Sequence, residues 1–376
     1  YPKLRYHLQF QNELKLFSDI GNREKFSINI YSNISTGIFL HISNLFHPST
    51  VDASFGHNGF GLCDGIKNDD DQWNLKGHSA RIVSVDAEAL SLFARLYGET
   101  GTSTLQARLP VVHSRQVLEV LRKFARQPKR LGDMEGEYLS TEMWHETNAQ
   151  KDGTIRRDTG FVDSAEELII SGPHFYVGKP LHQTPKVVCE THRAYDNLDL
   201  IALPDDYLPR TNYVQACDKS EILNKTPRVS WDDKAAKTQY YCLVSRFMLS
   251  QAGERTLISC ILPKNIGHIN TCISIVFRSL KITTNESGFF MSIPLDFLVK
   301  TTGRGQLGGF ISSFPIFKES SNIILRTLVL NCLTTHYAEL WEECWDEAFK
   351  EERWTKDDPR LDNAKYAKLP SKWQRT

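Results

Sequence analysis

The sequence predicts a mixed α/β protein of roughly two to three domains, because its 376 residues exceed the length of one ordinary domain. Strand-like alternation and two capped helices occupy residues 1–130. Residues 131–320 instead carry short apolar runs separated by Gly, Pro and Asn, which is typical of a β-rich domain with long loops. The runs are Leu168–Ile170, Phe175–Val177, Leu198–Leu200 and Leu257–Leu262. The end of the chain returns to helical spacing.

The N-terminal segment is expected to form a helix followed by two strands. Apolar residues in Leu8–Phe17 fit one face of an amphipathic helix, which Gly21 ends. Apolar and polar residues then alternate in Phe26–Tyr31 and again in Ile38–Ile42. The next stretch, Ser54–Gly77, is rich in Gly and Asp, has no period and is predicted to be a long loop.

Two helices with clear ends are predicted next, and their apolar faces are expected to dock on a sheet. Asp86 caps the first helix and Gly98 ends it, while Ser114 caps the second and Pro128 lies just beyond its end. A basic cluster at the end of the second helix suits a DNA phosphate backbone and a solvated helix end equally well. It consists of Arg122, Lys123, Arg126, Lys129 and Arg130.

The last predicted helix covers Ile323–Trp354, which contains no Gly or Pro and has an acidic outer face. Its aromatic stripe is interpreted as core, and docking of a partner is the alternative. The stripe consists of Leu333, Tyr337, Trp341, Trp345 and Phe349.

Composition excludes several classes of protein. The 45 Lys and Arg residues balance the 45 Asp and Glu residues, so no global positive field favours nonspecific coating of DNA. No run approaches the about 18 apolar residues that a membrane helix needs. The eight cysteines form no CxxC pair, which favours a reducing cytoplasm over a disulfide framework. The chain opens without an initiator Met or a secretory signal, so we expect a piece of a longer cytoplasmic protein.

Common catalytic signatures are absent from the sequence. It contains no GxxxxGK[ST], GxGxxG after a strand, HExxH or GxSxG motif, and no Asp/Glu-x-Lys nuclease triad. Cys189 and His192 are close enough for a nucleophile pair or half a metal site, but ordinary packing is the simpler interpretation. The carboxylates of Asp69–Asp71 are likewise interpreted as a solvated turn rather than a metal site. No catalytic, cofactor-binding or metal residue is therefore assigned.

Four polar loops carry side chains suited to DNA. Amides pair with adenine edges and guanidinium groups with guanine edges, while Gly lets backbone N–H groups approach phosphates. Ordinary soluble loops are the alternative interpretation. The candidate DNA-contacting residues are Asn148, Gln150, Lys151, Arg156 and Arg157 in the first loop, His174 and Lys179 in the second, Arg210 and Asn212 in the third, and Lys300, Arg304 and Gln306 in the fourth.

The N-terminal segment resembles part of a known enzyme family. Arg5–Tyr31, in which Glu13–Ile20 leads into Lys25–Ile30, resembles the last segment of the catalytic domain in large adenine-specific DNA methyltransferases of the type IIG restriction–modification kind. In that family a helix and an F-x-D-I/V turn precede the final strand of the methyltransferase sheet. Met143–Gly153 and Leu203–Tyr213 are also similar to long bacterial defence-island methylases.

A later part of the chain resembles the target-recognition domain of the same family. That domain has a strand, an N-T turn, a helix, a Gly-bearing loop and a closing [L/F]-P-I motif. The matching segments are Glu254–Ser259, Ile266–Thr271, Phe297–Gly305 and Phe314–Ile316.

The resemblance implies a role in S-adenosylmethionine-dependent adenine methylation, within a bacterial restriction–modification or antiviral defence system. The family's methyl-donor loop and its Asn-Pro-Pro-aromatic motif precede these segments and occur nowhere in this sequence. The donor and the flipped adenine therefore belong to the preceding part of the parent enzyme. This chain is expected to bind double-stranded DNA and to choose the site.

Four segments are expected on this basis. Residues 1–50 hold the closing strands of a methyltransferase sheet, and residues 51–130 form a helical connector. Residues 131–320 form an α+β target-recognition domain, and residues 321–376 form an acidic C-terminal helical segment that is the expected contact for other defence-system subunits. One alternative is a specificity or adaptor subunit without its own methylase, and another is a carbohydrate- or protein-binding β-module. An upstream Asn-Pro-Pro-Tyr or Asn-Pro-Pro-Phe in the parent reading frame would favour the first interpretation.

Overall fold

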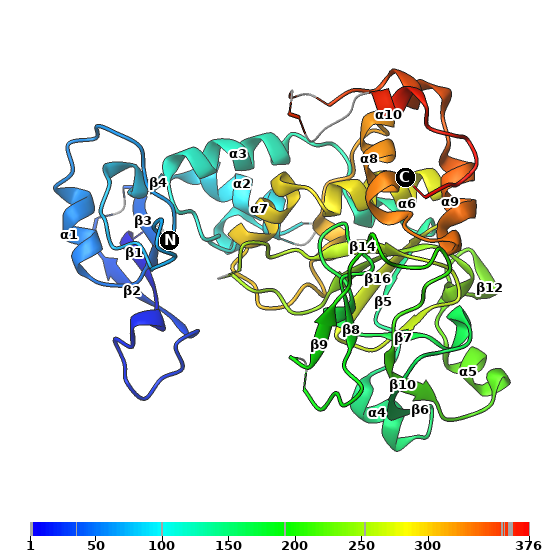
Figure 1. Ribbon diagram of the computed structural model, residues 1–376. Coiled ribbons are helices and arrows are strands. Elements are labelled where there is room, and N and C mark those ends of the chain that lie inside the picture. The colour runs from blue at the N-terminus through cyan, green and yellow to red at the C-terminus, as the bar shows by residue number, and fades with distance from the viewer. Residues whose placement is uncertain are drawn as a thin grey trace. The chain divides into compact units, whose positions relative to one another are not determined.

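The chain is a mixed α/β protein that forms two compact units in the computed structural model (Figure 1). Unit 1 comprises residues 1–130 and 300–303, and unit 2 comprises residues 131–299 and 304–376. The structure describes residues 3–34, 36–98, 101–191, 193–251, 253–354, 356, 358–359 and 364–375. The first change of unit falls after Arg130, where the third expected segment begins.

Unit 1 is built on a four-stranded sheet with the strand order β2-β1-β3-β4. Its strands are β1 (Leu4–Gln11), β2 (Lys25–Tyr31), β3 (Phe39–Leu45) and β4 (Val83–Val85). β1 is antiparallel to β2 and parallel to β3, which is antiparallel to β4. The central strand β3 is largely buried, whereas the edge strand β2 leaves Ile28, Ile30 and Tyr31 exposed. The methyltransferase identity of this sheet remains an expectation.

The predicted helix at the start of the chain is wrong. Its first part is β1, and only the short 3-10 helix η1 (Asn12–Leu14) follows. The buried Asn12 side chain accepts a hydrogen bond from Phe17 N at 2.9 Å and donates to Phe17 O, which folds the chain into a compact turn. Lys15 lies in the left-handed region at φ 56°, a conformation that ends a right-handed helix.

The loop and the two helices that follow agree with the sequence patterns. α1 (Ser49–Phe55) precedes a stretch without helix or named strand up to His78. α2 (Ala87–Tyr97) begins after Asp86, whose carboxylate accepts from Ala89 N at 2.8 Å. α3 (Arg115–Ala125) follows Ser114, which makes no side-chain cap hydrogen bond. α2 packs against α3 and against the short 3-10 helix η3 (Thr104–Gln106), and it also contacts β4.

The short segment 300–303 completes unit 1 although it lies far away in the sequence. Thr301 Oγ1 and Tyr97 OH share a buried hydrogen bond of 2.8 Å, and Val111 N donates to Thr301 O at 2.7 Å. Lys25 Nζ donates to Gly303 O at 3.2 Å. Unit 1 is therefore assembled from two separate parts of the chain.

Unit 2 has a buried antiparallel sheet with the strand order β14-β13-β16-β5 at its centre. Its strands are β5 (Tyr138–Thr141), β13 (Cys242–Arg246), β14 (Ser259–Leu262) and β16 (Cys272–Phe277). β13, β14 and β16 are almost entirely buried because, apart from the half-buried Arg246 at the end of β13, their residues are apolar, Ser or Cys. The strand predicted from the apolar run before Pro263 is confirmed as β14.

Small two-stranded sheets and short helices surround this central sheet. The pairs are β6 (Ile155–Gly160) with β10 (Thr211–Gln215), β7 (Ile169–Ile170) with β15 (Gly267–His268), β8 (Gln183–Pro185) with β9 (Tyr195–Asn197), and β11 (Arg228–Val229) with β12 (Asp232–Ala236). The helices are α4 (Glu146–Lys151) and α5 (Lys219–Lys225). The apolar runs Phe175–Val177 and Leu198–Leu200 are not strands, since they lie in loops between these pairs.

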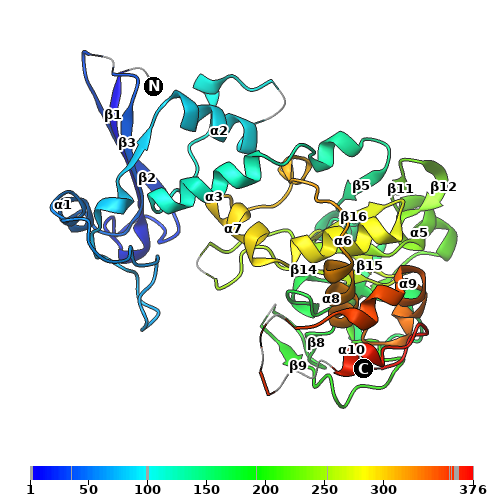
Figure 2. The same cartoon turned by 90° about the horizontal axis from the view of Figure 1, so that it is seen from above.

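The C-terminal part of unit 2 is helical but does not contain the single long helix that the sequence predicts. Its helices are α6 (Leu280–Phe290), α7 (Ile293–Thr301), α8 (Ser321–Asn331), α9 (Ala338–Cys344) and α10 (Ala364–Ala367), and only the last two residues of α7 belong to unit 1. α6 and α8 lie side by side in both views (Figure 1, Figure 2). Within the described part of the chain, no helix has the length and apolar character needed to cross a bilayer.

The break after α8 is explained by a buried side chain. Asn331 Oδ1 accepts from Ile261 N on β14 at 2.9 Å, and this contact fixes the end of α8 against the sheet. α9 then packs on α6 and α8 instead of continuing the line of α8. Tyr337, Trp341 and Phe349 are buried in the resulting cluster, so the interpretation of the aromatic stripe as core is confirmed.

Candidate nucleic-acid interface

The first predicted DNA loop is a helix followed by a strand. Asn148, Gln150 and Lys151 lie on α4, and Arg156 and Arg157 lie on β6. All five side chains are exposed. The residue types are therefore available to a ligand, but on regular elements and not on the expected loop.

α4 and β6 form because their inward residues are apolar. Ala149 and Ile155 are buried with Trp144 and Tyr213 in one hydrophobic cluster. Gly153 makes the turn between the two elements at φ 75°, a conformation that Gly adopts without steric cost. The polar residues between these anchors are thereby held outward on a packed support.

β6 pairs with β10, and this pairing fixes the two arginines. Arg157 lies opposite Tyr213 and its Nη2 donates to Cys189 O at 2.6 Å, which attaches β6 to the loop between β8 and β9. Arg156 forms an exposed ion pair with Asp158 at 3.3 Å. Exposed pairs of this kind contribute only about 0–1 kcal/mol, so Arg156 can exchange its partner for a phosphate at small cost.

An exposed apolar group lies beside these arginines. The Arg210 guanidinium stacks 4.5 Å above the ring of Phe161 and donates to Pro185 O at 3.2 Å. Phe161 is 63% exposed, and Val187 and Val188 are 72% and 71% exposed. We call Arg157, Phe161, Val187, Val188 and Arg210 the hairpin face. The two valines lie in the loop that joins β8 and β9, and the two arginines are hydrogen-bonded to backbone oxygens of this hairpin. Its three apolar members were not predicted from the sequence, although the adjacent valines that follow Pro185 and Lys186 in a polar loop were a usable signal.

Two of the candidate residues support this face from inside the protein and do not contact solvent. His174 is buried, and its ring nitrogens are hydrogen-bonded to Ser171 and to Arg210 O. Burial lowers the pKa of His174. Asn212 is also buried and donates to Tyr195 OH at 2.8 Å. The expectation that His174 and Asn212 contact DNA therefore does not fit their positions, because their polar atoms are used within the core.

The remaining candidates lie on other elements. Lys179 is half-buried in the turn that joins it to Tyr176. Lys300 lies in the last turn of α7. It is the first residue of the segment 300–303 that belongs to unit 1, whereas the preceding residues of α7 belong to unit 2. The Arg304 guanidinium lies 4.8 Å above Phe310. The exposed Gln306 follows on a segment that pairs with residues 247–249, a different part of unit 2 from the hairpin face.

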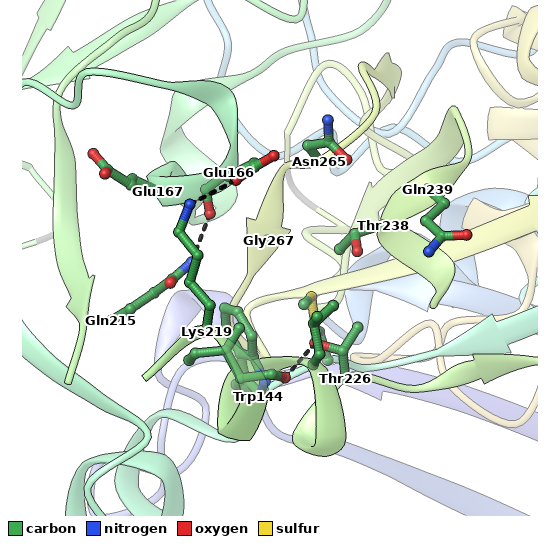
Figure 3. Close-up of a pocket in the computed structure, with 13 residues that line it drawn as sticks. Trp144, Glu166, Glu167, Gln215, Lys219, Thr226, Thr238, Gln239, Asn265 and Gly267 are labelled. Atoms are coloured by element: carbon green, nitrogen blue, oxygen red, sulfur yellow. Dashed lines mark hydrogen bonds and ion pairs between the residues drawn. The ribbon is translucent and has the colours of Figure 1, made fainter. Parts of the chain in front are cut away.

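A cavity of about 230 Å³ opens elsewhere in unit 2 (Figure 3). Lys219 Nζ lies 3.2 Å from Glu166 Oε2, and Glu167 adds a second carboxylate to the lining. Trp144 closes one side, and its buried Nε1 has no hydrogen-bond partner in the described structure. Because its acidic residues outnumber its single lysine, the cavity suits a small neutral or cationic ligand better than a phosphate.

Other candidate chemical groups do not form a site in the described residues. Cys189 is buried, whereas His192 lies outside the described residues, so their pairing is not assessed. Asp69–Asp71 form an exposed turn, in which Asp71 pairs with Lys67 at 2.7 Å, as the solvated-turn interpretation predicts. Across the described residues, no group of three or more His, Cys, Asp or Glu side chains is arranged to hold a metal ion.

The basic end of α3 has protein partners of its own. Arg122 pairs with Glu119 one turn earlier and with Glu88 on α2 at 3.5 Å. For Arg122 this arrangement favours the solvated helix end over the phosphate contact.

No protein-family model matches the chain, and a search of curated proteins finds no match. Its function is therefore inferred from its own residues and their geometry.

Proposed function

We propose that this chain binds double-stranded DNA and selects the target site of an S-adenosylmethionine-dependent, adenine-specific DNA methyltransferase of a bacterial restriction–modification or antiviral defence system. The hairpin face is the observation that supports this most. It combines two arginines with three exposed apolar side chains on a support fixed by strand pairing. The resemblance of Glu254–Ser259, Ile266–Thr271, Phe297–Gly305 and Phe314–Ile316 to a target-recognition domain supplies the enzyme class.

The exposed apolar side chains of the hairpin face would gain free energy by contact with a nucleic acid, compared with exposure to water. Leaving a large apolar side chain exposed forfeits up to about 1.5–3 kcal/mol relative to full burial, and contact with a base or a thymine methyl would recover part of it. Proteins that deform DNA insert similar apolar side chains between base steps. Arg157 and Arg210 stand beside the apolar group, where phosphates or guanine edges would lie.

Unit 1 supports the part of the proposal that concerns the parent enzyme. β2 is an edge strand with Ile28 and Ile30 each nearly half exposed and Tyr31 67% exposed. Edge strands with apolar side chains are usually covered or paired. A sheet that continues in a preceding catalytic domain would cover it, and that domain would also hold S-adenosylmethionine.

Fluorescence anisotropy with a labelled random duplex, over a series of salt concentrations, tests DNA binding. The double variant Arg156→Ala/Arg157→Ala should reduce the salt slope by about one for each lost phosphate contact. Arg278→Ala is the matched control, because Arg278 is an exposed arginine of unit 2 with a weak ion pair at 3.7 Å. Equal losses in the double variant and in the control, or no duplex binding by the wild type, would refute the proposal.

A further inference from the structure

A small cavity in unit 1 concentrates basic side chains. It has a volume of about 110 Å³ and is lined by His57, Cys63, Asp64, Lys76, His78 and Arg81 among others. This is the space of a few water molecules, enough for a five-atom oxyanion. We call it the Arg81 cavity.

Arg81 is a buried cation without a carboxylate partner in the described structure. The residue is 2% exposed, and its guanidinium donates to Ser43 O and Asn44 O, both at 2.9 Å, and to Lys76 O at 3.3 Å. Its Nε has no hydrogen-bond partner in the part of the chain that the structure describes. Burial lowers the pKa of Arg81 to about 10, so the side chain is still charged at neutral pH. Buried charges are normally paired, because removing them from water is costly.

Two imidazoles add hydrogen-bond donors to the same lining. His78 Nδ1 accepts from Ala80 N at 3.0 Å, so the neutral ring carries its proton on Nε2. That buried Nε2 has no partner among the described residues. His57 Nδ1 accepts from Gly59 N at 2.9 Å, which fixes the same tautomer, and the two rings lie 4.1 Å apart.

The charge of the lining favours an anion over a metal ion. Lys76 Nζ adds a second cation and lies 3.1 Å from Asp64, the one carboxylate of the lining. The described residues hold no cluster of His, Cys, Asp and Glu arranged for a metal, and Arg81 would repel a cation.

We propose that the Arg81 cavity binds a phosphate group, with the Arg81 guanidinium as its buried positive charge and with His57 and Lys76 nearer the surface. The phosphate would supply the countercharge that Arg81 lacks in the described structure. The phosphate belongs to a free or nucleotide-type monoester or to a DNA backbone. This site is in unit 1 and does not depend on the hairpin face.

Thermal unfolding of the whole chain in phosphate, compared with chloride at equal ionic strength, tests the proposal. A bound phosphate should raise the melting temperature in a saturable way, because a ligand of the folded state stabilises it by mass action. Lys76→Ala and His57→Ala should each weaken the apparent phosphate affinity about tenfold through loss of one donor. Asp64→Asn should tighten it, since the variant removes a negative charge. Lys123→Ala, which removes an exposed cation on α3, should change nothing.

Lys76→Ala should weaken the apparent phosphate affinity and Asp64→Asn should strengthen it. A purely structural role of these side chains would not give such opposite effects. No phosphate-specific stabilisation up to about 100 mM, or equal stabilisation of all variants, would overturn the proposal. Adenosine 5′-monophosphate and a short duplex then separate the sources of the phosphate. Tighter binding of the monophosphate assigns a nucleotide-type monoester, whereas competition by the duplex alone assigns a backbone phosphate. Arg156→Ala/Arg157→Ala should leave the phosphate effect intact, so failure of DNA recognition and failure of this site are distinguishable.

Discussion

Replacing Glu286 by glutamine should stabilise the protein at alkaline pH. Glu286 lies on α6, is 1% exposed, and has one carboxylate oxygen without a hydrogen-bond partner in the described structure. Its other oxygen accepts from Asn285 Nδ2 at 3.1 Å. Burial is the main cause that raises the pKa of Glu286 from 4.5 to about 7.

The size and sign of the effect follow from this pKa. One unit of pKa corresponds to about 1.4 kcal/mol, so ionising Glu286 in the folded protein costs about 3 kcal/mol. Because the folded pKa lies above the unfolded value, the folded state holds more protons between pH 4.5 and about 7. The free energy of unfolding is therefore not reduced by Glu286 below pH 4.5. It falls as pH rises from 4.5 through about 7, where the buried carboxyl group ionises.

Urea denaturation of the wild type and Glu286→Gln provides the assay. Near pH 5 the variant should exceed the wild type in free energy of unfolding by at most about 1 kcal/mol, and near pH 8 by about 3 kcal/mol. Glu342→Gln is the matched control, because Glu342 is exposed on α9 and should shift neither value. The same pH dependence in wild type and Glu286→Gln would refute the reasoning.

Three further predictions concern the core, the hairpin face and catalysis. Asn331→Ala should lower the free energy of unfolding by about 1–3 kcal/mol in urea denaturation, because Ile261 N loses its buried acceptor. Val187→Ser/Val188→Ser should leave the melting temperature unchanged, since both side chains are about 70% exposed, but should weaken duplex binding in the anisotropy assay. Incubation of the chain with labelled S-adenosylmethionine and DNA should give no methylated product, because the sequence lacks the Asn-Pro-Pro-aromatic motif; incorporation above background would contradict this.

Local sequence patterns were sufficient where an element carries its own end signals. Asp86 and Gly98 bound α2 in the structure as they do in the pattern, because capping depends on neighbours in the chain. The apolar run that becomes β14 is similarly self-contained.

Patterns failed where distant contacts decide the conformation. Leu8 and Phe10 fit helical spacing, but they also alternate with polar residues, and pairing with β2 and β3 selects the strand. α4 has six residues and exists because Ala149 packs into a cluster with β6 and β10. The single long C-terminal helix that the pattern predicts does not form, because α8 ends at Asn331. The side chain of Asn331 is held by Ile261 N, which lies 70 residues earlier.

The candidate site was predictable in residue type but not in arrangement. The exposed positions of Arg156 and Arg157 agree with a polar, basic segment. Phe161 and Arg210 come together only through the β6–β10 pairing, which joins segments far apart in the sequence. Burial of His174 and Asn212 likewise depends on tertiary contacts that their polar character conceals.

The contribution of residues 300–303 to unit 1 limits how the two units can be exchanged between related chains. Exchange of a unit is simplest when one cut on each side separates it from the rest of the chain. Here an exchange of everything after Arg130 would also replace Thr301, and with it the hydrogen-bond partner of Tyr97 and the acceptor of Val111 N. A successful chimera of the two units would keep this tetrapeptide matched to residues 1–130, which requires two junctions inside the exchanged sequence as well as those at its ends.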